Sequence, residues 1–380
     1  MKVTIAIDSF KGSLSTYEAG EAAALGIKRV FPDAVTEICP IADGGEGTAE
    51  AIISATHGKF VNVTVTGPLG EPVEAKYGIT PDGYAVIEMA SAAGITLVPE
   101  GRRNPLYTTT YGVGELIHHA ILVSGCRKFT VGIGGSATND GGVGMLSALG
   151  FRFLDKNGSS VREGALGLST LEKIDVSGAL PELSECEFSV ASDVKNPLCG
   201  ELGCSAVYGP QKGAAPESIR NMDEWLGHYA RLTEKALGRD DSEYPGAGAA
   251  GGLGFAFLSY LGAALTSGIE LVIERTGLLE KIQDTDIVIT GEGRLDGQSC
   301  MGKAPVGVAK LAKKYGKPVI AFSGCVTDDA RLTNAHGIDA FFPILKAPCT
   351  VEQAMDSENA KRNLSDTAEQ AFRLIKATRK

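Results

Sequence analysis

Residues 2–13, KVTIAIDSFKGS, give the clearest indication of the fold of this chain. A short apolar run ends there in an acid, and a glycine-containing loop follows. The run is typical of a buried strand. Ser15 and Glu18 then form a capping box, which predicts a helix that continues to Val30. A strand, a polar loop and a helix in this order form half of a βαβ unit. The opening of the chain therefore predicts a parallel sheet with a ligand-binding loop after its first strand.

The same alternation of short β-prone segments and longer helical patterns recurs along the chain. Further strands are expected at residues 35–39, 60–65, 84–89, 127–131, 187–191, 286–290, 318–322 and 340–343. Further helices are expected to begin near Thr48, Pro105, Asn139, Pro216, Gly252, Ala304 and Thr350.

The alternation is tight at both ends of the chain, whereas the middle has longer loops and is rich in glycine. A chain of 380 residues is also longer than one hydrophobic core usually serves. We therefore expect an α/β fold with two α/β domains. A mostly parallel flavodoxin/Rossmann-like sheet domain comprises residues 1–70 plus 280–380, and a second α/β domain, residues 71–279, is inserted into it.

Composition excludes several classes of function. The 36 basic and 46 acidic residues give a net charge of −10, which disfavours nucleic acid as a partner. The most apolar region, residues 253–265, is broken by polar residues and glycines, so we expect no membrane span. The eight cysteines form no C-x-x-C pair, and the first residues do not resemble an export signal. We expect a cytoplasmic protein with free thiols.

Four loops follow predicted strands of the terminal segments, at residues 8–13, 43–48, 291–299 and 323–325. The carboxyl ends of parallel strands share one edge of a sheet, so these loops should lie together. They combine glycines with side chains of both signs, namely the acids Asp8, Asp43, Glu46, Glu292 and Asp296 and the bases Lys11 and Arg294. Such carboxylates can hold Mg²⁺, and such cations can hold a small acid or a phosphate.

The middle of the chain contains the densest motif, GIGGSATNDGGVG at residues 132–144, directly after the strand expected at 127–131. Its glycines allow consecutive backbone amides to face one anion, and two hydroxyl groups can add donors. This pattern predicts a phosphate-binding loop. Further along, residues 191–198, ASDVKNPL, end another strand and make Asp193 a candidate general base or metal ligand. Residues 209–214, GPQKGA, are typical of a turn bearing one lysine.

A dinucleotide-binding function is the main competing interpretation of the glycine motif. Gly132, Gly134 and Ala137 match G-x-G-x-x-A, and Asp155 follows at about the spacing of a ribose-binding acid. The helix that should follow would contain three glycines, which disfavours it. Asp155 also begins a D-K-N-G sequence typical of a hairpin turn. We therefore consider an NAD-dependent hydroxy-acid dehydrogenase the weaker alternative, together with a non-catalytic small-molecule-binding module.

Six blocks of the sequence, in the order DSFKGS, PIADGGEGT, GIGGSATNDGG, ASDVKNPL, GPQKGA and TGEGRLDGQS, resemble the type I bacterial glycerate kinases over essentially the whole chain. The resemblance implies transfer of the γ-phosphoryl group of ATP to D-glycerate with Mg²⁺, giving 2-phosphoglycerate and ADP. A 3-phosphoglycerate product remains an alternative. It also implies two α/β domains with the active site in the inter-domain cleft. The partners are then small molecules, and the protein is a monomer or a homodimer.

Residue types and loop positions suggest a role for each candidate residue in such a reaction. Catalytic roles are expected for Asp193, Lys11 and Arg294, with Asp193 orienting and deprotonating the attacking hydroxyl. Substrate binding is expected from Asp8, Ser9, Lys11, Arg294 and Asp296. Nucleotide binding is expected from Gly134, Gly135, Ser136, Ala137, Thr138, Asn139 and Asp140. The candidate metal ligands are Asp8, Glu292 and Asp296.

Overall fold

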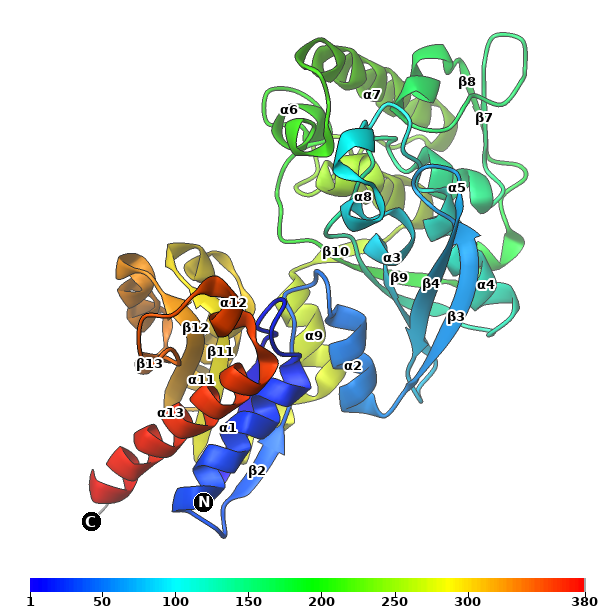
Figure 1. Ribbon diagram of the computed structural model, residues 1–380. Coiled ribbons are helices and arrows are strands. Elements are labelled where there is room, and N and C mark those ends of the chain that lie inside the picture. Colours follow the sequence, from blue (N-terminus) through cyan, green and yellow to red (C-terminus); the bar gives the residue numbers. More distant parts are fainter. Residues whose placement is uncertain (379–380) are drawn as a thin grey trace. The chain divides into compact units, whose positions relative to one another are not determined.

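The computed structural model describes residues 1–378 and divides the chain into two units (Figure 1). Unit 1 contains Met1–Asp43, Glu50–Thr56 and the chain from Ile269 onward, and unit 2 contains Gly44–Ala49 and His57–Gly268. The sequence predicts boundaries at 70 and 280 instead. The difference has a physical reason, since residues 59–66 pair with a strand of the unit 2 sheet and the helices after Gly268 join unit 1.

Five parallel strands form the sheet of unit 1, in the order β13-β12-β11-β1-β2. Their bounds are β1 Lys2–Ile7, β2 Val35–Ile38, β11 Ile287–Leu295, β12 Val319–Val326 and β13 Ala340–Pro343. Counted along this unit alone, the strand order is 2-1-3-4-5, which is the flavodoxin-like order. The expectation of a parallel flavodoxin-like sheet is therefore confirmed.

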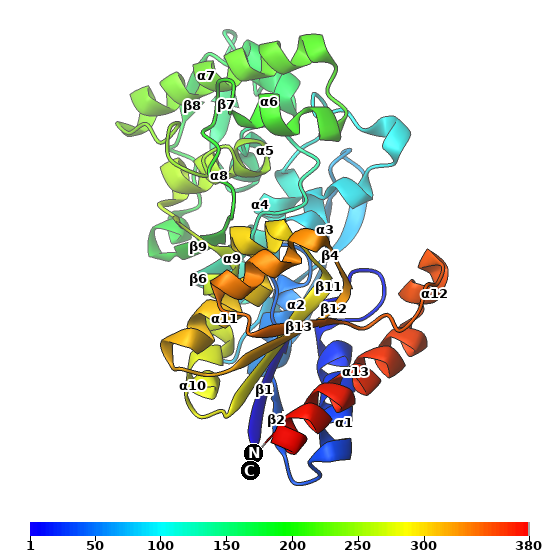
Figure 2. The same cartoon turned by 90° about the vertical axis from the view of Figure 1, so that its left-hand side faces the viewer.

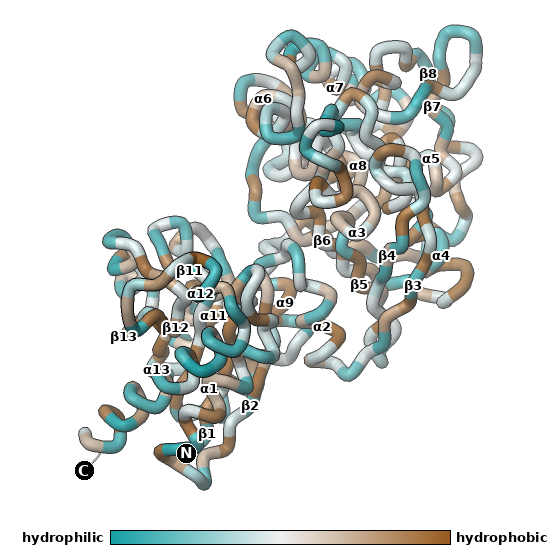
Figure 3. Tube along the Cα trace, viewed as in Figure 1, coloured by the Kyte–Doolittle hydropathy of each residue, from teal (hydrophilic) through white to brown (hydrophobic). Residues whose placement is uncertain are grey.

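Helices cover both faces of this sheet (Figure 2). They are α1 Thr16–Val30, α2 Thr48–Thr56, α9 Gly268–Thr276, α10 Leu278–Gln283, α11 Ala304–Lys314, α12 Val351–Met355 and α13 Ser357–Thr378. Helices α1 and α13 pack side by side, with α1 against β1 and α13 against β12, and their apolar faces join the core of this unit. A glycine permits their close approach, because a Cβ at Gly26 would lie 2.1 Å from the carbonyl oxygen of Ser365. Apolar and polar residues alternate along α13 (Figure 3), as a helix with one buried face requires.

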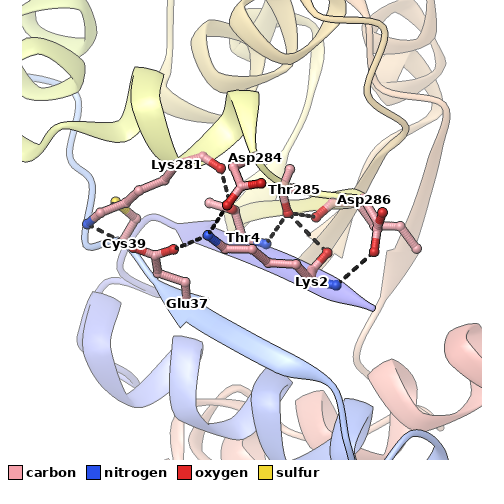
Figure 4. Close-up of polar contacts among 9 residues, drawn as sticks. Lys2, Thr4, Glu37, Cys39, Lys281, Asp284, Thr285 and Asp286 are labelled. Atoms are coloured by element: carbon pink, nitrogen blue, oxygen red, sulfur yellow. Dashed lines mark hydrogen bonds and ion pairs between the residues drawn. The ribbon is translucent and has the colours of Figure 1, made fainter.

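Polar contacts form a network at the end of the sheet where β1 begins (Figure 4). The amide of Lys2 donates to Asp286 at 2.8 Å, and its ammonium pairs with Asp284 at 3.0 Å. The amide of Thr4 donates to the hydroxyl of Thr285 at 3.0 Å. These contacts tie the segment before β11 to β1, so the charged residues at this edge have a structural role.

Unit 2 contains a six-stranded mixed sheet in the order β10-β9-β6-β5-β4-β3 and a small two-stranded antiparallel sheet, β7–β8. The bounds are β3 Lys59–Thr66, β4 Pro72–Ile79, β5 Tyr84–Glu88, β6 Lys128–Gly132, β7 Arg152–Leu154, β8 Lys173–Asp175, β9 Glu187–Ala191 and β10 Ala264–Thr266. Strand β4 is antiparallel to both β3 and β5, and β5, β6, β9 and β10 are parallel. This unit is therefore a second α/β domain with a partly antiparallel sheet.

The helices of unit 2 surround an apolar core in which Phe129 of β6 stacks on Phe188 of β9, with ring centroids 4.7 Å apart. They are α3 Ala90–Ala93, α4 Tyr111–Leu122, α5 Val143–Ala148, α6 Cys204–Tyr208, α7 Pro216–Leu237 and α8 Ala249–Leu261. Across residues 1–378, no helix combines the length and apolar content that crossing a membrane requires.

Candidate active site

The centre of the unit 1 sheet is the point at which strand order reverses, because β1 lies between β2 and β11. Ligands of open parallel sheets bind outside the carboxyl ends of strands at such a point. Asp8 follows β1 there, and its amide donates to the carbonyl of Gly291 at 2.9 Å. Strand β11 continues through Glu292 and Arg294 to Leu295, so these two side chains lie on a strand and not in the loop expected from Gly291 onward.

A cavity of about 380 Å³ opens at this edge of unit 1, within the usual size range of small-molecule sites. Its wall contains Asp8, Ser9, Lys11, Asp43, Glu292, Arg294 and Lys303, and an apolar side formed by Phe10, Ile344, Leu345, Ala354, Met355 and Ala360. Residues from four separate strand ends, far apart in the sequence, thus line one cavity. Of the substrate-binding candidates, Asp8, Ser9, Lys11 and Arg294 lie here, whereas Asp296 does not line the cavity.

The acids of the cavity repel one another. Asp8 is only 7% exposed, and burial, aided by the negative charges of Asp43 and Glu292, raises its pKa to about 7. The amide of Ser9 donates to Asp8 at 2.7 Å and partly opposes this shift. Burial also raises the pKa of Glu292. A cation placed between these carboxylates would relieve their repulsion.

Three basic side chains balance the acids. Lys11 lines the cavity, and Lys303 Nζ lies 3.8 Å from a carboxylate oxygen of Glu292. Arg294 is 64% exposed, and its Nε lies 3.3 Å from Asp296 Oδ2. The other oxygen of Asp296 accepts from the amide of Gln298 and caps the 3-10 helix η6, Gly297–Met301. Asp296 therefore orients Arg294 and a helix end.

The acids on the cavity wall suit Mg²⁺, which usually takes one or two carboxylates together with substrate phosphates. Asp8 and Asp43 both line the cavity, and the charge of Asp43 acts on Asp8. The oxygens of Glu292 are engaged by the hydroxyl of Ser299 and by Lys303. Among residues 1–378, no group of three or more acidic, histidine or cysteine side chains forms a ready-made metal cluster. The metal-ligand candidates Glu292 and Asp296 are thus already paired.

In unit 2, the glycine motif follows β6 and exposes Gly134 and Gly135 at its tip. Gly135 has φ +74°, a backbone conformation that favours glycine. Two hydrogen bonds anchor the loop to residues 93–95, from the amide of Ile95 to Gly135 and from the amide of Ala137 to Ala93. The amide of Ala137 is therefore engaged. No hydrogen bond from the amides of Gly134, Gly135 or Ser136 is found within the described part of the chain.

The second half of the motif is buried and holds the loop in place. Asp140 accepts hydrogen bonds from the amide and hydroxyl of Thr110 and from the amides of Gly142 and Gly144. Asn139 donates to the hydroxyl of Ser205 at 2.9 Å, and Thr138 is fully buried. These contacts give Asn139 and Asp140 a supporting role, so the parts of the motif that can meet a ligand are residues 134–136.

The structural context of a dinucleotide fingerprint is missing. The helix α5 begins only at Val143, after Gly141 and Gly142 adopt φ of +64° and +76°. The helix expected from Asn139 thus begins later. Asp155 lies in the predicted turn, where its side chain accepts from the amides of Asn157 and Ser159. It is part of a hairpin and not a ribose-binding strand end.

Asp193 follows β9 in unit 2, where its side chain is exposed and accepts from the amide of Gly268 at 3.1 Å. Lys11 and Arg294 belong to unit 1. Two lysines were missed as candidates. Lys303 precedes α11, and Lys212 of the GPQKGA turn lies against the glycine motif. Lys303 has no sequence signal of its own, whereas Lys212 lies in the GPQKGA block but was given no role there, because single lysines in turns are common.

Sequence and structure comparisons agree on one family. The profile of the glycerate kinase family matches residues 3–376. The chain is 50% identical over 373 residues to a glycerate 2-kinase of Escherichia coli K12, covering 97% of this chain and 98% of the relative. It is 50% identical over 371 residues to a glycerate kinase of Bacillus subtilis 168, covering 97% of each.

A crystal structure from Salmonella typhimurium LT2, assigned to glycerate kinase 2, superposes with a TM-score of 0.91 at 48% identity and covers 99% of this chain and 98% of that chain. Similarity of this extent leaves no part of the described fold outside the match. The chain therefore belongs to the glycerate kinase family and is a phosphotransferase.

Proposed function

We propose that the protein transfers the γ-phosphoryl group of ATP to the C2 hydroxyl of D-glycerate, giving 2-phosphoglycerate and ADP, in the cytoplasm. The observation that carries this proposal is the unit 1 cavity, which combines acids and bases at the strand-reversal point. The 50% sequence identity to a relative named glycerate 2-kinase supports the C2 hydroxyl, and not the C3 hydroxyl, as the acceptor.

In this proposal, the basic residues of unit 1 hold the anionic groups of the acceptor. Lys11 and Arg294 line the same cavity, and an arginine can bind a carboxylate through two parallel hydrogen bonds. Asp296 keeps the guanidinium of Arg294 in place. The apolar side of the cavity excludes water, which would otherwise compete with glycerate as the acceptor.

The amides of residues 134–136 in unit 2, at the exposed tip of the glycine motif, hold the phosphates of the nucleotide. Consecutive amides without side chains in the way form a suitable anion site. Mg²⁺, when bound, neutralises charge on the transferring phosphates, and Asp8 and Asp43 are the residues that would hold it. The expectation that the acceptor and nucleotide meet between two domains stays a prediction.

We propose that Asp193, a carboxylate at a strand end of unit 2, accepts the proton of the attacking hydroxyl. Asp193→Asn should then lower kcat by roughly 10² or more, the usual range for a general base, while leaving the KM for ATP near its wild-type value. Asp8, whose pKa lies near neutrality, is the competing proton acceptor. Wild-type turnover of Asp193→Asn together with inactive Asp8→Asn would move the role to Asp8.

Steady-state kinetics of Arg294→Ala test the acceptor site. The KM for D-glycerate should rise by at least about tenfold, because a charge-assisted hydrogen bond is lost, and the KM for ATP should change far less. Arg331→Ala removes an exposed arginine of the same unit outside the cavity and serves as the matched control. An increase confined to the KM for ATP would reverse the assignment of the two sites.

ADP release upon mixing ATP, Mg²⁺ and D-glycerate tests the reaction itself. Formation of ADP should require all three components. A change in nicotinamide absorbance with NAD and glycerate, without ADP formation, would instead support the dehydrogenase alternative. Tight glycerate binding with neither signal would indicate a binding module.

A further inference from the structure

The side chain of Lys212 is buried directly behind the exposed tip of the glycine motif. Lys212 ends the 3-10 helix η5, Pro210–Lys212, and is only 3% exposed. Its Nζ lies 2.7 Å from Ser136 Oγ and 2.6 Å from the carbonyl oxygen of Thr138. The backbone next to it has little freedom, since Gly213 has φ +87° and a Cβ there would lie 2.2 Å from a carbonyl oxygen of Arg103.

The contact with Lys212 fixes the direction of the Ser136 hydroxyl. An ammonium group can only donate hydrogen bonds, so Ser136 Oγ must accept from it. The proton of that hydroxyl is then available to a different acceptor. Ser136 is 8% exposed and follows the exposed Gly134 and Gly135. An anion bound by the amides of these glycines would therefore lie next to the Ser136 hydroxyl.

The charge of Lys212 is not held in an ion pair. Both hydrogen bonds found for its ammonium within the described residues go to neutral oxygens, and the buried Asp140 offsets its charge only in part, from beyond ion-pair distance. A buried cation without a counter-ion is unfavourable. Burial accordingly lowers the pKa of Lys212 to about 8. An anionic ligand at the loop would remove this penalty.

We propose that Lys212 is a positioning residue of the nucleotide site, which turns the Ser136 hydroxyl toward the phosphate chain of ATP and places a positive charge behind residues 134–136. This inference rests on the proposed nucleotide site in unit 2. It predicts that the lysine acts on the nucleotide and not on the glycerate.

The test compares Lys212→Met with Lys156→Met, which removes the same charge from an exposed turn of the same unit. In Lys212→Met, the KM for ATP and the calorimetric Kd for ADP should each rise by at least about tenfold, as for loss of a charged hydrogen bond. The KM for D-glycerate should stay within about twofold. Lys156→Met should match the wild type in all three values.

A wild-type Kd for ADP in folded Lys212→Met would overturn the inference, and so would equal increases in both KM values, which indicate a general loss of structure. If Lys212→Met does not fold, Ser136→Ala decides, because it keeps the lysine. It should raise the Kd for ADP by roughly threefold or more, the effect of one net hydrogen bond, and an unchanged Kd would contradict the inference. Wild-type protein that forms no ADP from glycerate would count against the proposed function instead.

Discussion

Asp8 is a single residue whose burial in the unit 1 cavity lowers the stability of the free protein. It is buried close to the negative charges of Asp43 and Glu292, and its pKa rises to about 7. Like charges brought together in a low-dielectric environment destabilise the fold unless a cation neutralises them. The unit therefore retains an unfavourable arrangement, which the Mg²⁺ of the proposed reaction would relieve.

Replacing this carboxylate should stabilise the free protein and abolish its activity. Asp8→Asn is expected to raise the free energy of unfolding by roughly 1–3 kcal/mol at pH 8, because it removes a buried, repelled charge. Chemical denaturation in the presence of EDTA measures this effect, with the exposed Asp33→Asn as the control. A lower stability of Asp8→Asn than of the control would show that the carboxylate is favourably paired.

At the scale of elements, α1 shows how far local sequence determines structure. The predicted capping box is present, with the hydroxyl and amide of Ser15 bonded reciprocally to Glu18, and the helix ends at Val30 as expected. Strand β9 also has its predicted bounds, and β13 likewise. The capping box of α1 is a contact among neighbouring residues, whereas β9 and β13 pair with distant strands and are recognised from their β-prone residues.

Other elements were predicted less well. Strand β4 was missed although it pairs with β3 across a short turn, because its sequence, PVEAKYGI, is poor in β-branched residues. The helix expected near Pro105 is a turn followed by α4 from Tyr111, since Thr110 bonds to Asp140. Residues 250–252 have positive φ, and Gly251 has no room for a Cβ against the carbonyl oxygen of Thr138. That glycine cluster therefore packs against residues 138 and 139 of the glycine motif.

The capping box of α1 predicts a pH-dependent stability. The amide of Ser15, with help from Lys361, lowers the pKa of Glu18 to about 2 from its usual 4.5. A depressed carboxylate pKa stabilises the fold above about pH 4.5, and this contribution decreases as the pH falls toward 2. Glu18→Gln should therefore cost about 1 kcal/mol at pH 7, a modest value for a side chain that is 38% exposed.

Urea unfolding of Glu18→Gln and of the exposed control Glu21→Gln, measured from pH 7 to pH 3, checks this prediction. The difference between Glu18→Gln and the wild type should shrink toward the acidic end. A difference that is constant over this range would show that the charge of Glu18 contributes nothing to the cap.

In the molecule as a whole, the two units differ in the chemical groups that they present. Unit 1 presents acids and bases at a strand-reversal point, and unit 2 presents exposed amides backed by a buried lysine. The sequence predicts the loops that line the unit 1 cavity and the glycine motif of unit 2, because glycines and charges after strands are visible in a single chain. It missed Lys212 and Lys303, whose proximity to Ser136 and Glu292 depends on the tertiary fold.

The phosphorus NMR spectrum of the product formed from ATP, Mg²⁺ and D-glycerate tests directly whether the protein phosphorylates the C2 hydroxyl of glycerate. Phosphate on C2 is coupled to the single proton of that carbon, so we expect a doublet from 2-phosphoglycerate together with the signals of ADP. A triplet from phosphate on C3 would contradict the proposed acceptor hydroxyl. Unchanged ATP would contradict the proposed reaction.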